Sequence, residues 1–195
     1  MIIGLTGRNA AGKGTVAQWL QNRGFGYISL SDAIRKWLAS QGRDASRDNL
    51  IQGGRQLRAE GGPGVLADHT LAVLQPGLDF AVDSVRNPAE VLVLRGRPDF
   101  LLLDVRAAEA VRFARLTARA RQGDAQSFAE FQRQERAELD STDPVAQQLI
   151  STAKMADAVI DNDGDQADLD RALTVALAQW QATLSAGPWP RRETP

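Results

Sequence analysis

The chain alternates short apolar runs with longer amphipathic segments, a pattern typical of a parallel sheet that is wrapped by helices. The run at 100–105 is almost entirely apolar, as expected for a strand that is buried on both faces. We therefore expect an α/β fold of three layers, with a doubly wound, parallel, five-stranded sheet. Its strands are predicted at 2–6, 27–30, 78–85, 100–105 and 158–161.

Helical periodicity and end signals predict helices between these strands. Pro88 and Gly96 bracket a short helix, Ser127 and Glu130 form a capping box, and a further helix is expected to start at Asp143. The other helices are predicted at 13–22, 32–40, 46–60, 65–74, 107–121 and 166–184. Because no linker interrupts the pattern, we expect one domain over 1–185, with a helical lid at about 112–140 and a flexible, Pro-rich tail at 186–195.

The strongest chemical signal is the segment Gly7-Arg-Asn-Ala-Ala-Gly12-Lys13-Gly14-Thr15, between a predicted strand and a predicted helix. In this context the glycines let backbone N–H groups surround phosphates, the helix N-terminus adds positive charge, and Lys13 reaches the outer phosphates. The general pattern has Ser or Thr directly after the lysine as a Mg²⁺ ligand, but here Gly14 stands there and the hydroxyl follows at Thr15. The predicted ATP-binding residues are Gly7, Asn9, Ala11, Gly12, Lys13, Gly14, Thr15 and Val16, and Thr15 is also a predicted metal ligand.

Carboxylates follow several predicted strands at the sheet edge where ligands bind in this architecture. Asp83 ends an apolar strand in the manner of a Mg²⁺-binding acid, and Asp104 ends another, so the pattern alone does not choose between them. We favour Asp83 because Arg86 follows it closely. Asp32, after the second strand, is a candidate to orient or deprotonate the acceptor, or equally a helix-capping acid.

Arginines group on predicted helices near this edge. Arg115 and Arg119, with Arg112 and Arg121 close by, are candidates to neutralise transition-state charge, and 123–126 is a candidate lid tip. A solvated face is the alternative for such clusters, with Glu60 and Glu109 as compensating charges. The predicted acceptor-binding residues are Asp32, Arg35, Arg55, Arg58 and Arg86. Asn162, after the fifth strand, is predicted to line the ATP site, or to form a plain turn.

Composition narrows the remaining possibilities. The 195 residues contain no cysteine and one histidine, His69, which we expect to be structural, so disulfides and Cys-ligated metals are excluded. With 23 basic and 24 acidic residues, the net charge of −1 argues against binding a nucleic acid polymer. The N-terminus has no targeting pattern and no apolar run is long enough to span a membrane. We expect a cytoplasmic protein, monomeric or homodimeric, that binds a small phosphorylated substrate and no membrane.

Several of these segments resemble P-loop nucleoside monophosphate kinases and dephospho-CoA kinases. They are 4–17 with Gly-Lys-Gly-Thr, 30–35 with Ser-Asp-Ala-Ile-Arg, and 156–164 with the closing Asn-Asp-Gly. The chain looks most similar to an archaeal P-loop family often described as dephospho-CoA-kinase-like, which also shares features of 58–64 and 83–91. The resemblance covers roughly 1–175 and implies an ATP-binding core, Mg²⁺ and an Arg-bearing lid.

Two departures lower the dephospho-CoA interpretation. Authentic dephospho-CoA kinases carry Asp-Ala-Asp after the second strand and Gly-Lys-Ser-Thr in the loop, whereas this chain has Ser29-Leu-Ser-Asp32 and Gly-Lys-Gly-Thr. The leading prediction is therefore transfer of the γ-phosphoryl group of ATP to a nucleoside or deoxynucleoside monophosphate. Dephospho-CoA as acceptor and a non-catalytic nucleotide sensor stay as the alternatives.

Overall fold

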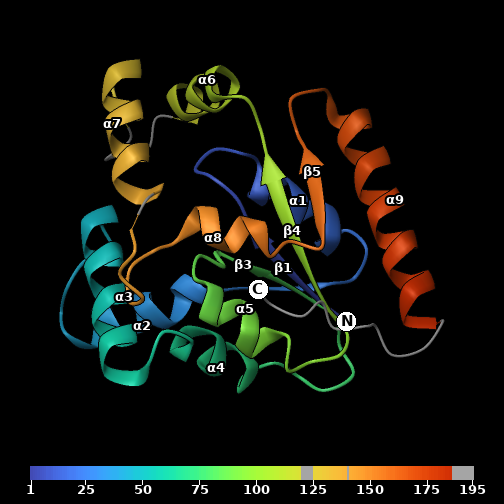
Figure 1. Ribbon diagram of the computed structural model, residues 1–195, viewed down its shortest axis with the longest axis horizontal. Coiled ribbons are helices and arrows are strands. Elements are labelled where there is room, and N and C mark those ends of the chain that lie inside the picture. The colour runs from blue at the N-terminus through green and yellow to red at the C-terminus, as the bar shows by residue number, and fades with distance from the viewer. Residues whose placement is uncertain (120–124, 140, 186–195) are drawn as a thin grey trace.

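The computed structural model describes residues 1–119, 125–139 and 141–185, and within them five parallel strands form one sheet in the order β2-β3-β1-β4-β5 (Figure 1). This confirms the predicted fold class. Arg121, the first half (123–124) of the predicted lid tip at 123–126, and the predicted tail at 186–195 lie outside the described residues. The strands are β1 (Ile2–Thr6), β2 (Gly26–Ser29), β3 (Phe80–Asp83), β4 (Phe100–Arg106) and β5 (Ala158–Asp161).

Helices cover both faces of the sheet, as the alternation of strands and helices predicts (Figure 1). Within the described residues they are α1 (Lys13–Gln21), α2 (Leu30–Ser40), α3 (Arg47–Gly61), α4 (Val65–Leu71), α5 (Pro88–Leu94), α6 (Glu109–Arg119), α7 (Phe128–Leu139), α8 (Leu149–Lys154) and α9 (Gln166–Ser185).

Side-chain alternation along β1 divides the core into two layers. Ile3 and Leu5 pack with α1 and α9 on one face, while Ile2 packs with α2, α3, α4 and α5 on the other. All five residues of β1 are buried, as its central position requires. Because the strands are parallel, their carboxyl ends meet at one edge, with Thr6 opposite Asp104 and Ser29 opposite Asp83.

Helices α6 and α7 lie in the segment that the sequence predicts as a lid, and this lid segment has its own small core. Leu116, Ala125 and Phe131 are buried together, and the ring of Phe113 lies 5.6 Å from that of Phe131 between centroids. Ala10 of the phosphate loop packs against this cluster. The lid therefore rests directly on the loop between β1 and α1.

Several predicted boundaries shift by a few residues, and two of the shifts have a clear structural cause. The strand predicted at 78–85 is limited to Phe80–Asp83, because Ser84 takes a positive φ of 66° and pairing with β1 begins only at Phe80. The helix predicted from Asp143 begins only at Leu149. Backbone oxygens of this segment accept hydrogen bonds from the side-chain amide of Asn87, which holds it against the sheet edge in an irregular conformation.

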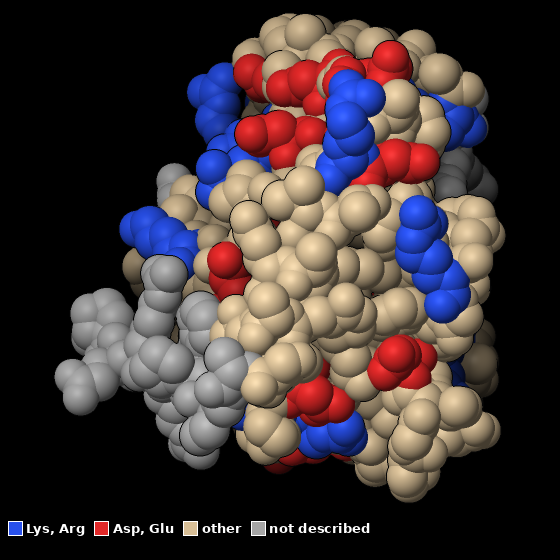
Figure 2. Space-filling model, turned by 90° about the vertical axis from the view of Figure 1, so that its right-hand side faces the viewer, with Lys and Arg blue, Asp and Glu red and all other residues tan. Residues whose placement is uncertain are grey.

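Figure 2 shows the side of the molecule on which α9 lies. Charged side chains gather toward its upper end, with a smaller group near the lower end, and uncharged residues fill most of the middle. In the described ranges of the chain, no helix combines the length and apolarity that crossing a membrane requires.

The two-sided burial of β4 predicts where the fold is most sensitive. Leu103→Ala, at a fully buried position of β4, should lower the free energy of unfolding by about 2–5 kcal/mol, because the cavity cannot collapse between two layers. Val159→Ala, at an exposed position of β5, should lower it by less than about 1 kcal/mol. Denaturant unfolding measures both, and equal losses would contradict this account of the core.

Candidate active site

The loop between β1 and α1 has the form of a phosphate cradle. Gly12 takes a φ of 103°, and the backbone N–H groups of Asn9, Ala10 and Gly12 donate to no group among the described residues. These amides precede the N-terminus of α1, where the helix dipole adds partial positive charge. Such an arrangement can bind the oxygens of a phosphate chain.

Lys13 lies across this loop. Its Nζ donates to the carbonyl oxygens of Gly7 at 2.7 Å and Arg8 at 3.0 Å. These hydrogen bonds hold the ammonium group against the start of the loop, and the predicted contact of Lys13 with the outer phosphates stays a prediction. Of the other predicted ATP-binding residues, Thr15 is exposed near the start of α1, whereas the side chain of Val16 lies in the core and leaves only its backbone for a ligand.

Asn162 and Arg115 tether the loop from two sides. The side-chain amide of Asn162 donates to the carbonyl of Ala11 at 2.9 Å, and Arg115 donates to Ala11 at 3.4 Å and to the Asn162 carbonyl at 2.7 Å. A Cβ on Gly12 would lie 2.0 Å from Nδ2 of Asn162, so only glycine fits there. Asn162 thus shapes the loop through its side chain.

The other lid arginines divide into two kinds. Arg119 donates to the Asn9 side chain at 3.1 Å and so faces the loop. Arg112 is fully buried, forms a two-pronged ion pair with Glu135 of α7, and packs over the Phe131 ring. Arg112 therefore joins helices α6 and α7, whereas Arg115 and Arg119 contact the phosphate loop.

Asp83 keeps both carboxylate oxygens on the β2 side of the sheet edge. Oδ1 accepts a hydrogen bond from the Ser84 backbone at 2.6 Å, and Oδ2 accepts one from the Tyr27 hydroxyl at 3.2 Å. Partial burial, followed by the negative charge of Asp83, raises the pKa of Tyr27 to about 12.

Asp104 is more deeply buried. Arg106 donates to its Oδ2 at 2.6 Å, and its other oxygen has no partner within the described ranges. It lines a cavity of about 390 Å³ together with Gly7 and Arg8 of the phosphate loop. Asp83 ends β3 and Asp104 lies two residues before the end of β4; both strands flank β1, and both aspartates stay candidates to hold a cation.

The donor set suits Mg²⁺. Among the described residues, no group of three or more His, Asp or Glu side chains could enclose a metal ion. Mg²⁺ is commonly held by one or two carboxylates together with phosphate oxygens and waters. Asp83 or Asp104, with the Thr15 hydroxyl, could supply the protein's share of such a site, while the nucleotide supplies the rest.

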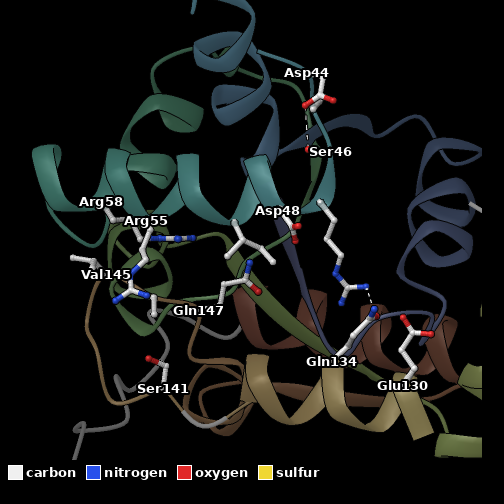
Figure 3. A pocket seen from close by; sticks show the side chains of 14 residues that line it. Asp44, Ser46, Asp48, Arg55, Arg58, Glu130, Gln134, Ser141, Val145 and Gln147 are labelled. Atoms are coloured by element: carbon white, nitrogen blue, oxygen red, sulfur yellow. Dashed lines mark hydrogen bonds between the residues drawn. The ribbon is translucent and has the colours of Figure 1, made fainter. Parts of the chain in front are cut away.

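A second cavity, of about 1050 Å³, lies between α3 and α7, whose labelled side chains face one another across it (Figure 3). Arg47 of α3 donates to Gln134 of α7 at 3.1 Å, bridging the cavity. Most of the residues that line it are polar or charged, and none of them among the described residues is aromatic: Asp44, Ala45, Ser46, Arg47, Asp48, Ile51, Arg55, Arg58, Glu130, Gln134, Ser141, Val145, Ala146 and Gln147.

The predicted acceptor-binding residues reach this cavity unequally. Arg55 and Arg58 line it, and Arg86 donates to Gln147 in its wall at 2.9 Å. Asp32 and Arg35 do not line it. Asp32 accepts a hydrogen bond from the Ser29 backbone at 2.9 Å, completing a capping box at α2, and pairs with Arg35 at 2.9 Å.

Sequence reasoning missed the acids that compensate the arginines. In the described ranges, Glu135 pairs with Arg112, Glu90 with Arg58 and Asp143 with Arg55, rather than Glu60 or Glu109 with any of them. No periodic signal marks these acids, because each partner comes from a different element. His69 is exposed on α4 and lines neither cavity.

Comparison with known sequences finds relatives over most of the chain. A UPF0200 protein of Methanothermobacter thermautotrophicus is 33% identical over 142 residues, which cover 71% of this chain and 72% of that protein. A UPF0200 protein of Thermococcus gammatolerans is 26% identical over 194 residues, covering 96% of this chain and 99% of that protein. No family model matches. Neither name states a reaction, so the dephospho-CoA-kinase-like grouping stays a prediction.

Solved structures of small-molecule kinases share the fold. Shikimate kinase from Bacteroides thetaiotaomicron superposes with a TM-score of 0.59 at 14% identity, covering 93% of this chain and 98% of that chain. A gluconokinase from Sinorhizobium meliloti gives 0.54 at 16% identity, covering 94% of both chains. At such identities the likeness establishes the P-loop kinase fold and nothing about the acceptor.

The contact between Gly12 and Asn162 predicts a position-specific cost. Gly12→Ala should lower the free energy of unfolding by about 1–3 kcal/mol, because a Cβ collides with Asn162 and a positive φ is strained. Gly14→Ala, where a Cβ meets nothing within 4 Å, should leave it unchanged or raise it by up to about 1 kcal/mol. Denaturant unfolding of both variants measures these changes, and equal changes in the free energy of unfolding would contradict the close contact between Gly12 and Asn162.

Tyr27 is the only tyrosine in the chain, so its ionisation can be followed by absorbance. The tyrosinate midpoint should lie near pH 12, because burial and the Asp83 charge disfavour the phenolate. Asp83→Asn should lower that midpoint toward the ordinary value of about 10. Circular dichroism recorded in parallel shows that the fold persists; a midpoint that does not respond to Asp83→Asn would disprove the contact.

Proposed function

The chain belongs to the UPF0200 family, and we propose that it is an ATP-dependent kinase that transfers the γ-phosphoryl group to a small nucleotide-type acceptor. The observation that carries the proposal is the phosphate loop. Its N–H groups without a described acceptor, the α1 N-terminus and the Lys13 ammonium all belong to the loop at the carboxyl end of β1. The shared fold with small-molecule kinases supports the same reaction class.

In this proposal the loop amides and Lys13 bind the outer phosphates of ATP. Arg115 and Arg119, which already contact the loop, neutralise charge that spreads over the transferred group. Asp83 and Thr15 hold Mg²⁺, with Asp104 as the other carboxylate placed to do so. When bound, Mg²⁺ would neutralise developing charge on the phosphate oxygens. The lid excludes water, which limits hydrolysis of ATP.

The acceptor is proposed to lie in the cavity between α3 and α7. Its volume of about 1050 Å³ is sufficient for a nucleotide, and Arg55 and Arg58 supply guanidinium groups for an anionic end. A nucleoside or deoxynucleoside monophosphate is the acceptor we favour, because its attacking phosphate oxygen is already anionic. Such a reaction needs no strong base, which agrees with the engagement of Asp32 in a cap and an ion pair.

The direct test is ADP formation from Mg-ATP over a panel of nucleoside monophosphates, deoxynucleoside monophosphates and dephospho-CoA. We expect acceptor-dependent ADP with one class of monophosphate, and loss by about 100-fold or more in Lys13→Ala, because that variant lacks the phosphate-binding cation. Lys36→Ala, at an exposed lysine of α2, is the matched control. ATP binding without acceptor-dependent ADP would reject the kinase and favour a nucleotide sensor.

Asp32→Asn separates the two acceptor chemistries. With a monophosphate acceptor we expect kcat and the acceptor KM to stay within about threefold of the wild type, because no base is required and Asp32 does not line the cavity between α3 and α7. A hydroxyl acceptor such as dephospho-CoA requires proton removal, so kcat would instead fall by about 100-fold or more. Steady-state kinetics on the active acceptor measures both constants.

A further inference from the structure

Glu90 of α5 is a fully buried carboxylate that joins two parts of the candidate site. Its Oε1 accepts hydrogen bonds from Nε and Nη2 of Arg58, at 3.0 and 2.6 Å. Its Oε2 accepts from the backbone N–H groups of Arg86 and Asn87, at 2.8 and 3.0 Å. Four donors satisfy the acid, so its position and rotation are fixed.

This arrangement fixes the direction of Arg58. The Arg58 side chain is only 4% exposed, yet it lines the cavity between α3 and α7. Two of its nitrogens are held by Glu90, while Nη1 has no hydrogen-bond partner in the part of the chain that the structure describes. Because the guanidinium is planar, holding one edge on Glu90 sets where Nη1 points. Gly54, one turn earlier on α3, leaves the room that Nη1 occupies.

The other oxygen of Glu90 fixes the segment that follows Asp83. The two backbone groups that it binds begin three residues after this candidate Mg²⁺ ligand. The side chain of Asn87 in turn donates to the carbonyls of Pro144 at 2.7 Å and Ala146 at 3.0 Å, and Ala146 lines the cavity. Glu90 therefore fixes both the orientation of Arg58, which lines the cavity, and the position of a segment that contacts the cavity wall.

We propose that Glu90 is a positioning residue for acceptor binding. It holds Arg58 with one donor directed into the cavity, so that an anionic group such as a phosphate binds at a single place relative to the Asp83 segment. Glu90 itself does not touch the substrate. The assignment of the cavity to the acceptor rests on the proposed function, whereas the orientation of Arg58 does not.

The test is calorimetric binding of inorganic phosphate, carried out in the Lys13→Ala background so that the loop lysine does not contribute. Glu90→Gln should weaken phosphate binding by about tenfold or more, because its amide NH₂ meets only donors and Arg58 loses its fixed orientation. Arg58→Lys keeps the buried pair and the charge but loses the fork, and should weaken binding similarly. Glu60→Gln, an exposed acid on α3, is the control and should bind as the parent does.

With the Lys13 side chain restored and an active acceptor, Glu90→Gln should raise the acceptor KM about tenfold while kcat and the KM for ATP stay within about threefold. If Glu90→Gln folds and binds phosphate with the affinity of the parent, the inference is overturned. If Glu90→Gln does not fold, parent-like phosphate affinity in Arg58→Lys overturns it. Absence of phosphate binding in the parent, or parallel loss of all kinetic constants, would also overturn it. Phosphate binding that follows this pattern in a chain that forms no ADP would reject the kinase alone.

Discussion

The carbonyl of Ala11 and the neighbouring Gly12 are held between the Asn162 amide and the Arg115 guanidinium, and the geometry of the phosphate loop depends on this contact. Any side chain at Gly12 would displace Asn162, and Asn162 belongs to the turn that follows β5. The loop is therefore supported by the opposite end of the chain and by the lid. This support leaves the N–H groups of Asn9, Ala10 and Gly12 without an acceptor among the described residues.

In the lid segment, a buried ion pair holds two helices together in a similar way. Arg112 and Glu135 are both nearly inaccessible, and removing Glu135 would leave the buried Arg112 charge unpaired at a cost of about 3–5 kcal/mol. The pair fixes α7 against α6, so that Arg115 and Arg119 stay near the loop. A chain with a net charge of −1 can in this way place several arginines at one edge of the sheet, because buried acidic side chains neutralise the arginines that have a structural role.

The features that were predicted correctly from the sequence are those that depend on local residue spacing. The phosphate loop followed from its glycines and lysine between a strand and a helix, and the two-sided burial of β4 followed from its apolar run. The ion pairs could not be predicted, because their partners stand 23 residues apart for Arg112 and Glu135, 32 for Arg58 and Glu90, and 88 for Arg55 and Asp143. The helix predicted from Asp143 is wrong for the same reason: the side chain of Asn87, which is distant in the sequence, holds the segment before α8 in an irregular conformation.

The central claim is that the loop, the lid arginines and the α3–α7 cavity together carry a phosphoryl group from ATP to an acceptor. The most direct measurement follows the label from ATP labelled at its γ-phosphate, in the presence of Mg²⁺ and the acceptor panel. The account predicts label on an organic acceptor and little in inorganic phosphate, because the lid excludes water. Label that remains in ATP, or appears only in inorganic phosphate with every acceptor, would contradict it.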